Sequence, residues 1–178
     1  VWEMLQLWEK LKEKKIRNLI SVIFLSFPIF FVDLFSKLKI ISIFKNGDIE
    51  KIYINQFLDF ILVFNTGISY GLFSGGGSFQ KWILIIISLG IIIFLLNFVK
   101  NESSFTTRVS ISFIIGGALG NVFDRFFYGA VVDFISLHAK GFSWYIFNVA
   151  DMFIVFGVIL FLLSHLLQSG TKLENWNA

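Results

Sequence analysis

Residues 81–99 read K-W-I-L-I-I-I-S-L-G-I-I-I-F-L-L-N-F-V. After Lys81, no side chain in this stretch carries a charge. A bilayer has a hydrocarbon core about 30 Å thick, and a helix needs roughly 20 mainly apolar residues to cross it. The stretch therefore predicts a transmembrane helix, with Trp82 at the membrane–water interface.

Three further apolar runs, at residues 19–36, 109–127 and 147–167, have similar length and character. The chain has 178 residues, of which 56% are hydrophobic and 15% are charged, and its mean hydropathy is +0.79. A soluble domain of this size keeps far more charge on its surface. We therefore expect an all-α membrane protein with four transmembrane helices. The four crossings occupy nearly the whole chain, so residues 1–178 are expected to form a single domain.

Residues 1–17 mix apolar and charged side chains and come just before the first crossing. They predict an amphipathic cytoplasmic segment, although a frayed terminus explains the pattern equally well. Positive charge before a first crossing places the N-terminus in the cytoplasm, and four crossings return the C-terminus to the same side. The basic residues concerned are Lys10, Lys12, Lys14, Lys15 and Arg17.

Residues 40–80, between the first two crossings, differ in character from the helices. The turn signal N-G-D at 46–48 separates stretches rich in β-prone residues, and a glycine run at 75–77 follows. The pattern predicts an extracytoplasmic loop that holds a small β element, with the glycines as a flexible return.

Composition excludes several kinds of function. The chain has no cysteine, which excludes disulfides, thiolate metal sites and a cysteine nucleophile. The net charge is only +3 and shows no basic-aromatic pattern, so no nucleic-acid partner is expected. No H-E-x-x-H motif occurs, and His138 and His165 are too far apart for a zinc pair. No metal or cofactor is indicated.

Charged residues within the apolar runs need a physical explanation. Each ionisable group costs roughly 2.5–3.5 kcal/mol to place in the membrane interior on insertion scales. With the expected topology, these residues collect at one level near the outer membrane–water interface. They are Asp33 and Lys37 late in the first helix, Asp124 and Arg125 late in the third, Asp133 just beyond it, and Asp151 early in the fourth.

Structural explanations suffice for some of these residues. Asp33 and Lys37 are four residues apart, so an ion pair at the end of a helix, with the lysine reaching toward water, is favoured over chemistry. Asp124 and Arg125 are expected to form an interfacial pair or to position a substrate. Asp151 has no basic residue within seven positions on either side, so its partner must come from elsewhere in the fold.

Asp133 is the natural partner for Asp151. Two carboxylates in one site of low dielectric constant cannot both ionise cheaply, so they share one proton. An aspartyl protease requires this state, because one carboxylate activates a water and the other donates a proton. A carboxylate pair for proton or cation transport fits the spacing equally well, and a binding protein without catalysis is a third alternative.

Four segments, in order, resemble the lipoprotein signal peptidase (signal peptidase II) family. They are V-D-L-F-S-K (32–37), F-N-T-G-I-S-Y-G (64–71), G-G-A-L-G-N-V-F-D-R-F-F-Y-G-A-V-V-D-F (116–134) and F-N-V-A-D (147–151). The third segment, with the fourth at its proper distance, is highly specific. The second departs from the family at Ile68 and Tyr70, where small residues and phenylalanine are usual, so these residues are expected to reshape the edge of the pocket.

The resemblance implies a role for each matching residue. Asp133 and Asp151 fall on the catalytic pair. Residues implied to line the site and hold the substrate, or the peptide antibiotic globomycin, are Asn121, Arg125 and Asn148. Residues implied to support the site are Asn65 and Gly67 in the strand-like segment, Asp33 and Lys37 in the first helix, and Asp124 in the third.

The resemblance also implies the reaction and its location. The substrate is a prolipoprotein whose cysteine already carries diacylglyceryl, cut on the N-terminal side of that cysteine. The enzyme would lie in the bacterial cytoplasmic (inner) membrane with its active site near the outer leaflet, in contact with membrane lipids.

Overall fold

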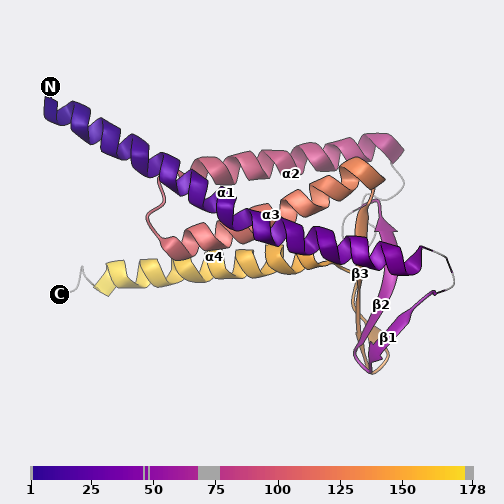
Figure 1. The fold of residues 1–178 in the computed structure, drawn as a ribbon. Coiled ribbons are helices and arrows are strands. Elements are labelled where there is room, and N and C mark those ends of the chain that lie inside the picture. The colour runs from indigo at the N-terminus through magenta and orange to yellow at the C-terminus, as the bar shows by residue number, and fades with distance from the viewer. Residues whose placement is uncertain (1, 46, 48, 68–76, 175–178) are drawn as a thin grey trace.

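Four long helices make up most of the part of the chain that the computed structural model describes, which is residues 2–45, 47, 49–67 and 77–174. The helices are α1 (Trp2–Phe44), α2 (Gly77–Val99), α3 (Phe105–Tyr128) and α4 (Val149–Glu174). Each is long and apolar enough to cross a membrane (Figure 1). The prediction of an all-α membrane protein with four transmembrane helices is confirmed.

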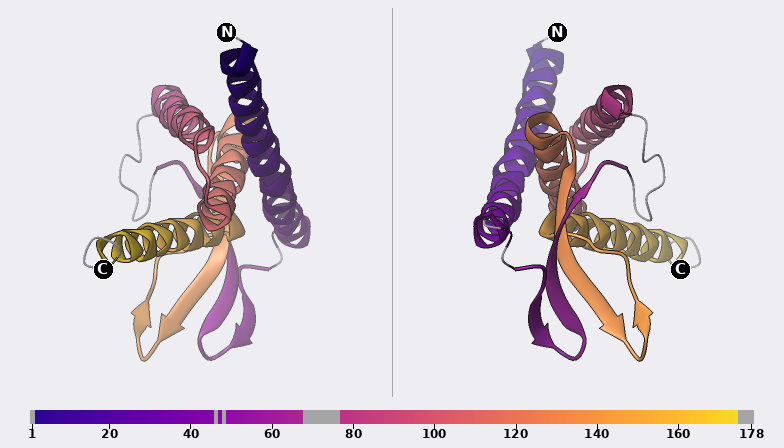
Figure 2. Two further views of the ribbon diagram at one scale, coloured as in Figure 1. Left: turned by 90° about the vertical axis from the view of Figure 1, so that its left-hand side faces the viewer. Right: turned by 90° about the vertical axis from the view of Figure 1, so that its right-hand side faces the viewer.

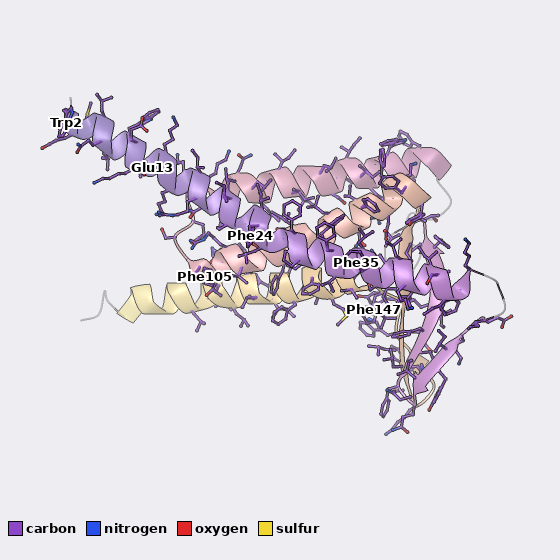
Figure 3. The ribbon with its side chains drawn as sticks, viewed as in Figure 1. Trp2, Glu13, Phe24, Phe35, Phe105 and Phe147 are labelled. Atoms are coloured by element: carbon purple, nitrogen blue, oxygen red, sulfur yellow. The ribbon has the colours of Figure 1, made fainter. Side chains whose placement is uncertain are left out.

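The first helix is longer than the sequence pattern suggested. Residues 2–17 and the first apolar run form one continuous helix of 43 residues, which is about 65 Å long. Its N-terminal part projects beyond the other helices, and Figure 3 shows Trp2 and Glu13 on this projecting part. Asn18 lies at the base of this part, and its side-chain amide donates to the carbonyl of the last residue of α2 and to two carbonyls just after it, the shortest bond being to Glu102 at 2.7 Å. This contact fixes the point at which α1 leaves the bundle.

A four-stranded antiparallel sheet lies at the opposite end of the bundle from the N-terminus (Figure 2). Its strands, in spatial order, are β1 (Ile52–Asn55), β2 (Leu58–Asn65), β3 (Val131–Ala139) and β4 (Phe142–Ser143). The predicted β element between the first two helices is confirmed. The second half of the sheet, contributed by the segment between α3 and α4, was not predicted.

The third helix packs between α1 and α4 through the glycines of G-G-A-L-G. A Cβ atom on Gly116 would lie 2.7 Å from the carbonyl oxygen of Ser26 in α1. A Cβ atom on Gly117 would lie 2.5 Å from the carbonyl oxygen of Ala150 in α4. Small residues let membrane helices approach closely, so these glycines serve helix packing.

We expect Gly117→Ala to lower the free energy of unfolding by about 1–3 kcal/mol, because the added methyl group meets backbone that cannot move independently. Thermal unfolding in detergent measures the effect. Gly90→Ala is the matched control, since a Cβ atom on Gly90 of α2 has no atom within 4 Å among the described residues. Equal stability of the two variants would contradict the packing argument.

Candidate active site

A polar cavity of about 180 Å³ lies where the end of α3, the start of α4 and strands β2 and β3 meet. Both Asp133 and Asp151 line it, as the sequence predicted for a carboxylate pair. The other residues that line it are Asn65, Gly67, Asn121, Arg125, Val131, Tyr145 and Ile146.

The carboxylate of Asp133 is buried in the sheet. The third helix ends at Gly129, whose φ of 77° is a left-handed conformation that glycine adopts without strain. The chain then enters β3, which is paired with β2 in a register that sets Asp133 opposite Val63. The side-chain amides of Asn65 and Asn148 donate to the two carboxylate oxygens of Asp133 at 2.9 and 2.6 Å.

The carboxylate of Asp151 lies in the first turn of α4. The backbone N–H of Asp151 donates to Oδ1 of Asn148 at 2.9 Å, and the backbone N–H of Asn148 donates to Oδ2 of Asp151 at 3.3 Å. This reciprocal arrangement is a helix-capping box, which fixes both side chains. The amide of Asn121 in α3 donates to the other oxygen of Asp151 at 2.9 Å.

One residue, Asn148, therefore contacts both carboxylates. Its side chain donates to Asp133 and its backbone N–H donates to Asp151. Its amide also donates to Oδ1 of Asn121 at 3.2 Å, so Asn121 and Asn148 form a continuous set of hydrogen bonds between the two acids. The two carboxylates thus face one cavity and are held by neutral donors.

The environment of Asp133 favours its protonated form. Burial raises the pKa of Asp133 from 3.8 to about 6, and the carboxylate of Asp151 raises it further, while the hydrogen bonds from Asn65 and Asn148 oppose the rise. A carboxyl group with a pKa near neutrality is suited to proton transfer.

This pKa predicts a pH-dependent stability. The folded protein holds the Asp133 proton more tightly than the unfolded chain, so this contribution is complete below pH 3.8 and is lost as the pH rises through 6. We expect the free energy of unfolding of the wild type to fall by up to about 3 kcal/mol over this range for this reason. Asp133→Asn should remove that part of the decrease. Denaturation of both proteins from about pH 4 to pH 7 is the measurement, and parallel profiles would contradict the prediction.

Lys37 is buried among acidic residues. Its ammonium lies 2.7 Å from the carboxylate of Asp33 and 2.8 Å from that of Asp124, and all three side chains are at most 1% exposed. The ion pair with Asp33 that the helical spacing predicted is present. The expectation that Lys37 reaches toward water is wrong, because Asp124 supplies a second partner inside the bundle. The ammonium also donates to Oδ1 of Asn121 at 3.1 Å.

Each acidic partner of Lys37 also anchors the chain beside one of the two cavity acids. Asp124 accepts a hydrogen bond from the backbone N–H of Val132 at 3.0 Å, one residue before Asp133. Asp33 accepts one from the backbone N–H of Ala150 at 2.8 Å, one residue before Asp151. A single buried cation therefore contacts both carboxylates that hold the two acid-bearing segments.

Arg125 lines the cavity, whereas its neighbour Asp124 does not. Its guanidinium donates to the carbonyl of Gly67 at 3.1 Å, and the backbone N–H of Gly67 donates to Oδ1 of Asn65 at 2.9 Å. The expected interfacial pair of Asp124 with Arg125 is therefore replaced by the Lys37–Asp124 pair. Ile68 and Tyr70, expected to reshape the pocket's edge, lie outside the described residues.

Two residues of the site were missed by the sequence reasoning. Tyr145 and Ile146 line the cavity, but they carry no signal that separates them from other aromatic and aliphatic residues of a membrane protein. His138 lies in β3 outside the cavity, and its Nε2 is 2.9 Å from the buried carboxylate of Asp59 in β2. Among the described residues, no group of three acidic or histidine side chains is arranged to hold a metal ion.

The structure is that of a four-helix membrane protein with a cavity lined by two carboxylates at one end of the bundle. The family described as "Signal peptidase (SPase) II" matches residues 25–167. The lipoprotein signal peptidase of Pelagibacter ubique is 41% identical over 150 residues, which cover 84% of this chain and 89% of the relative. The lipoprotein signal peptidase of Methylobacterium radiotolerans is 47% identical over 116 residues, 65% of this chain and 68% of the relative.

A solved bacterial membrane enzyme, determined by the in meso method at 2.3 Å resolution, has the same fold. It superposes with a TM-score of 0.73 at 30% sequence identity, covering 85% of this chain and 91% of the other. The chain belongs to the lipoprotein signal peptidase family. It is an aspartic-type signal peptidase II and a multi-pass bacterial membrane protein, and its family cleaves signal peptides from lipoproteins.

Proposed function

We propose that this enzyme cleaves the signal peptide from diacylglyceryl-modified prolipoproteins on the N-terminal side of the lipidated cysteine, using Asp133 and Asp151 as its catalytic pair. The observation that carries the proposal is the cavity that both carboxylates line, with Asn148 bonded to each of them. Neutral amide groups donate the side-chain hydrogen bonds to both carboxylates, an arrangement compatible with a proton shared between them.

The reaction follows from the two protonation states. The ionised carboxylate takes a proton from a water molecule, whose oxygen attacks the scissile carbonyl carbon. The neutral carboxyl donates its proton to the carbonyl oxygen, which gives a tetrahedral intermediate. The carboxyl that took the proton from water then passes it to the peptide nitrogen, while a hydroxyl group of the intermediate returns a proton to the other carboxylate. The C–N bond breaks, a carboxylic acid forms at the end of the signal peptide, and the amine of the lipidated cysteine leaves. Asn65, Asn121 and Asn148 keep the two carboxylates in place through these steps.

The orientation in the membrane is part of the proposal. The basic residues of the projecting part of α1 favour the cytoplasm, which also sets the C-terminus there. The cavity lies at the other end of the bundle, beside the sheet, which corresponds to the outer leaflet (Figure 1). A diacylglyceryl-cysteine anchored in that leaflet has its scissile bond at the same depth as the acid pair.

The test uses the full chain in proteoliposomes with a diacylglyceryl prolipoprotein and its unlipidated counterpart. We expect cleavage of the lipidated substrate alone, with an N-terminal lipidated cysteine and one oxygen atom from labelled water in the released signal peptide, both detected by mass spectrometry. A globomycin-type peptide should block the cleavage. Binding without cleavage, or proton flux without cleavage, would support the alternatives of a binding protein or a transporter and overturn the proposal.

A further inference from the structure

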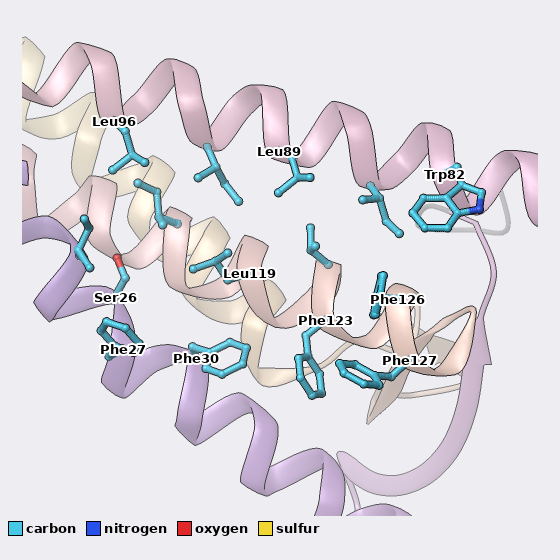
Figure 4. A pocket seen from close by; sticks show the side chains of 15 residues that line it. Ser26, Phe27, Phe30, Trp82, Leu89, Leu96, Leu119, Phe123, Phe126 and Phe127 are labelled. Atoms are coloured by element: carbon cyan, nitrogen blue, oxygen red, sulfur yellow. The ribbon is translucent and has the colours of Figure 1, made fainter.

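A second and larger cavity lies in the membrane part of the bundle, between α1, α2 and α3. It has a volume of about 650 Å³. Figure 4 shows side chains from all three helices directed into this space, with Phe27 and Phe30 from α1, Leu89 from α2, and Leu119 and Phe123 from α3. We call this space the apolar groove. The residues that line it are Ile23, Ser26, Phe27, Phe30, Trp82, Ile85, Leu89, Ile92, Leu96, Ile115, Leu119, Val122, Phe123, Phe126 and Phe127.

Apart from the ring nitrogen of Trp82, the lining of the groove offers no unpaired polar side chain, among the described residues, that would bind a polar ligand. Its hydroxyl group, on Ser26, donates to the carbonyl of Val22 at 2.8 Å and also lies 3.1 Å from that of Ser112. The remaining side chains are aliphatic or aromatic, and Trp82 stands at one end of the groove with its polar ring nitrogen at the edge (Figure 4). Only an apolar ligand is compatible with such a lining.

Size decides which apolar ligand fits. On α2 the groove extends from Trp82 to Leu96, which is about 21 Å along a helix axis. A helix of that length and about 10 Å across fills roughly 1,600 Å³, so a signal-peptide helix is too large. A water-sized group occupies about 30 Å³, so the groove has room for about 20 such groups. One fatty acyl chain contains a similar number of methylene groups.

The groove and the acidic cavity lie on neighbouring faces of the last turns of α3. Asn121 and Arg125 line the acidic cavity, and the residues that follow each of them, Val122 and Phe126, line the apolar groove. Phe126 packs edge-on against Trp82, with ring centroids 6.2 Å apart. A chain in the groove therefore has one end at the level of the acid pair, while the rest runs toward the middle of the membrane.

We infer that the apolar groove binds one fatty acyl chain of the substrate's diacylglyceryl group. The inference rests on the proposed function, because it takes the substrate from that proposal, and it adds the site that recognises the lipid. With the lipidated cysteine at the acid pair, its glyceryl group lies near Trp82 and one acyl chain descends between α1 and α3. Recognition of the lipid then depends on chain length as well as on the presence of the modification.

The test compares Leu89→Trp, which fills the groove, with Ile86→Trp, a change to a residue on the same helix that is 65% exposed and outside the groove. Both proteins are assayed in proteoliposomes with dipalmitoyl and dioctanoyl versions of one prolipopeptide. We expect Leu89→Trp to raise KM for the dipalmitoyl substrate by at least about tenfold, with kcat little changed. It should change KM for the dioctanoyl substrate much less, and Ile86→Trp should leave both unchanged. Equal effects of Leu89→Trp on the two substrates would overturn the inference.

A second measurement does not depend on turnover. The Asp151→Asn variant is irradiated with the same prolipopeptide carrying a diazirine in one acyl chain, and the modified residues are mapped by mass spectrometry. We expect labelling at Leu89, Leu119 and Phe123. Labelling of these residues by a diazirine phospholipid that excess prolipopeptide does not displace would overturn the inference in favour of a bilayer lipid. Labelling at the groove by a prolipopeptide that the wild type fails to cleave would instead refute the proposed function while keeping the lipid site.

Discussion

Replacing Asp151 with asparagine is expected to lower kcat/KM for a diacylglyceryl prolipoprotein by about four orders of magnitude or more. The neutral amide can neither take a proton from water nor donate one as an acid, so the pair loses one of its two functions. The fold should persist, since asparagine has the same shape and retains an oxygen that can accept the hydrogen bond from Asn121. Asp133→Asn should have an effect of the same size, because the two acids act as a unit.

The control for this prediction is Asp59→Asn. Asp59 is a buried carboxylate on β2 of the same sheet, and its partners Lys51 and His138 lie outside the acidic cavity. This variant should retain most of the activity. Binding of the diazirine prolipopeptide by the two inactive variants separates loss of chemistry from loss of folding. Substantial cleavage by either Asp133→Asn or Asp151→Asn would reject the pair assignment.

Replacing Lys37 with methionine is expected to lower the free energy of unfolding by about 3–5 kcal/mol, the usual result of breaking a buried ion pair by removing one partner. Asp33 and Asp124 would then remain buried, with no cation in contact. Cleavage should fall as well, because these two carboxylates hold the backbone next to Asp133 and Asp151. Thermal unfolding in detergent and the prolipoprotein assay measure the two effects.

Two further variants separate charge from packing at this site. Lys37→Met combined with Asp124→Asn removes one of the stranded charges, so it should regain part of the lost stability. Lys39→Met changes an exposed lysine on the same helix and should leave stability within about 0.5 kcal/mol of the wild type. If Lys37→Met and Lys39→Met unfold at the same temperature, the buried network does not stabilise the fold.

The helices could be predicted from the sequence because their signal is local. Each crossing is an unbroken apolar run whose length matches the thickness of a membrane, and no distant contact is needed to recognise it. The strand β3 could not be predicted in this way. Its residues form a strand because they pair with β2, from which two of the four helices separate them along the chain. Such a distant pairing cannot be recognised in a short apolar segment such as V-V-D-F.

The residues of the site also differ in whether local sequence or a distant contact determines them. Asp151 was identified from physical reasoning alone, since an isolated carboxylate in an apolar run must have a distant partner. The ion pair of Lys37 with Asp33 followed from helical spacing, but its second pair with Asp124 depends on how α1 packs against α3. The asparagines that hold the two acids were found only through the family motifs, because an asparagine near the end of a helix is unremarkable by composition.

The order of the elements along the chain has a consequence for biosynthesis. The first three crossings and β3 supply Asp133, Asn121, Lys37 and both of its carboxylate partners, but Asp151 and Asn148 arrive only with the last helix. Until that helix inserts, Asp33 lacks the hydrogen bond that it accepts from the backbone N–H of Ala150 in the folded protein. A nascent chain still being inserted into the membrane therefore has no assembled acid pair. Under the proposed mechanism, proteolytic activity begins only when the fourth crossing has been inserted.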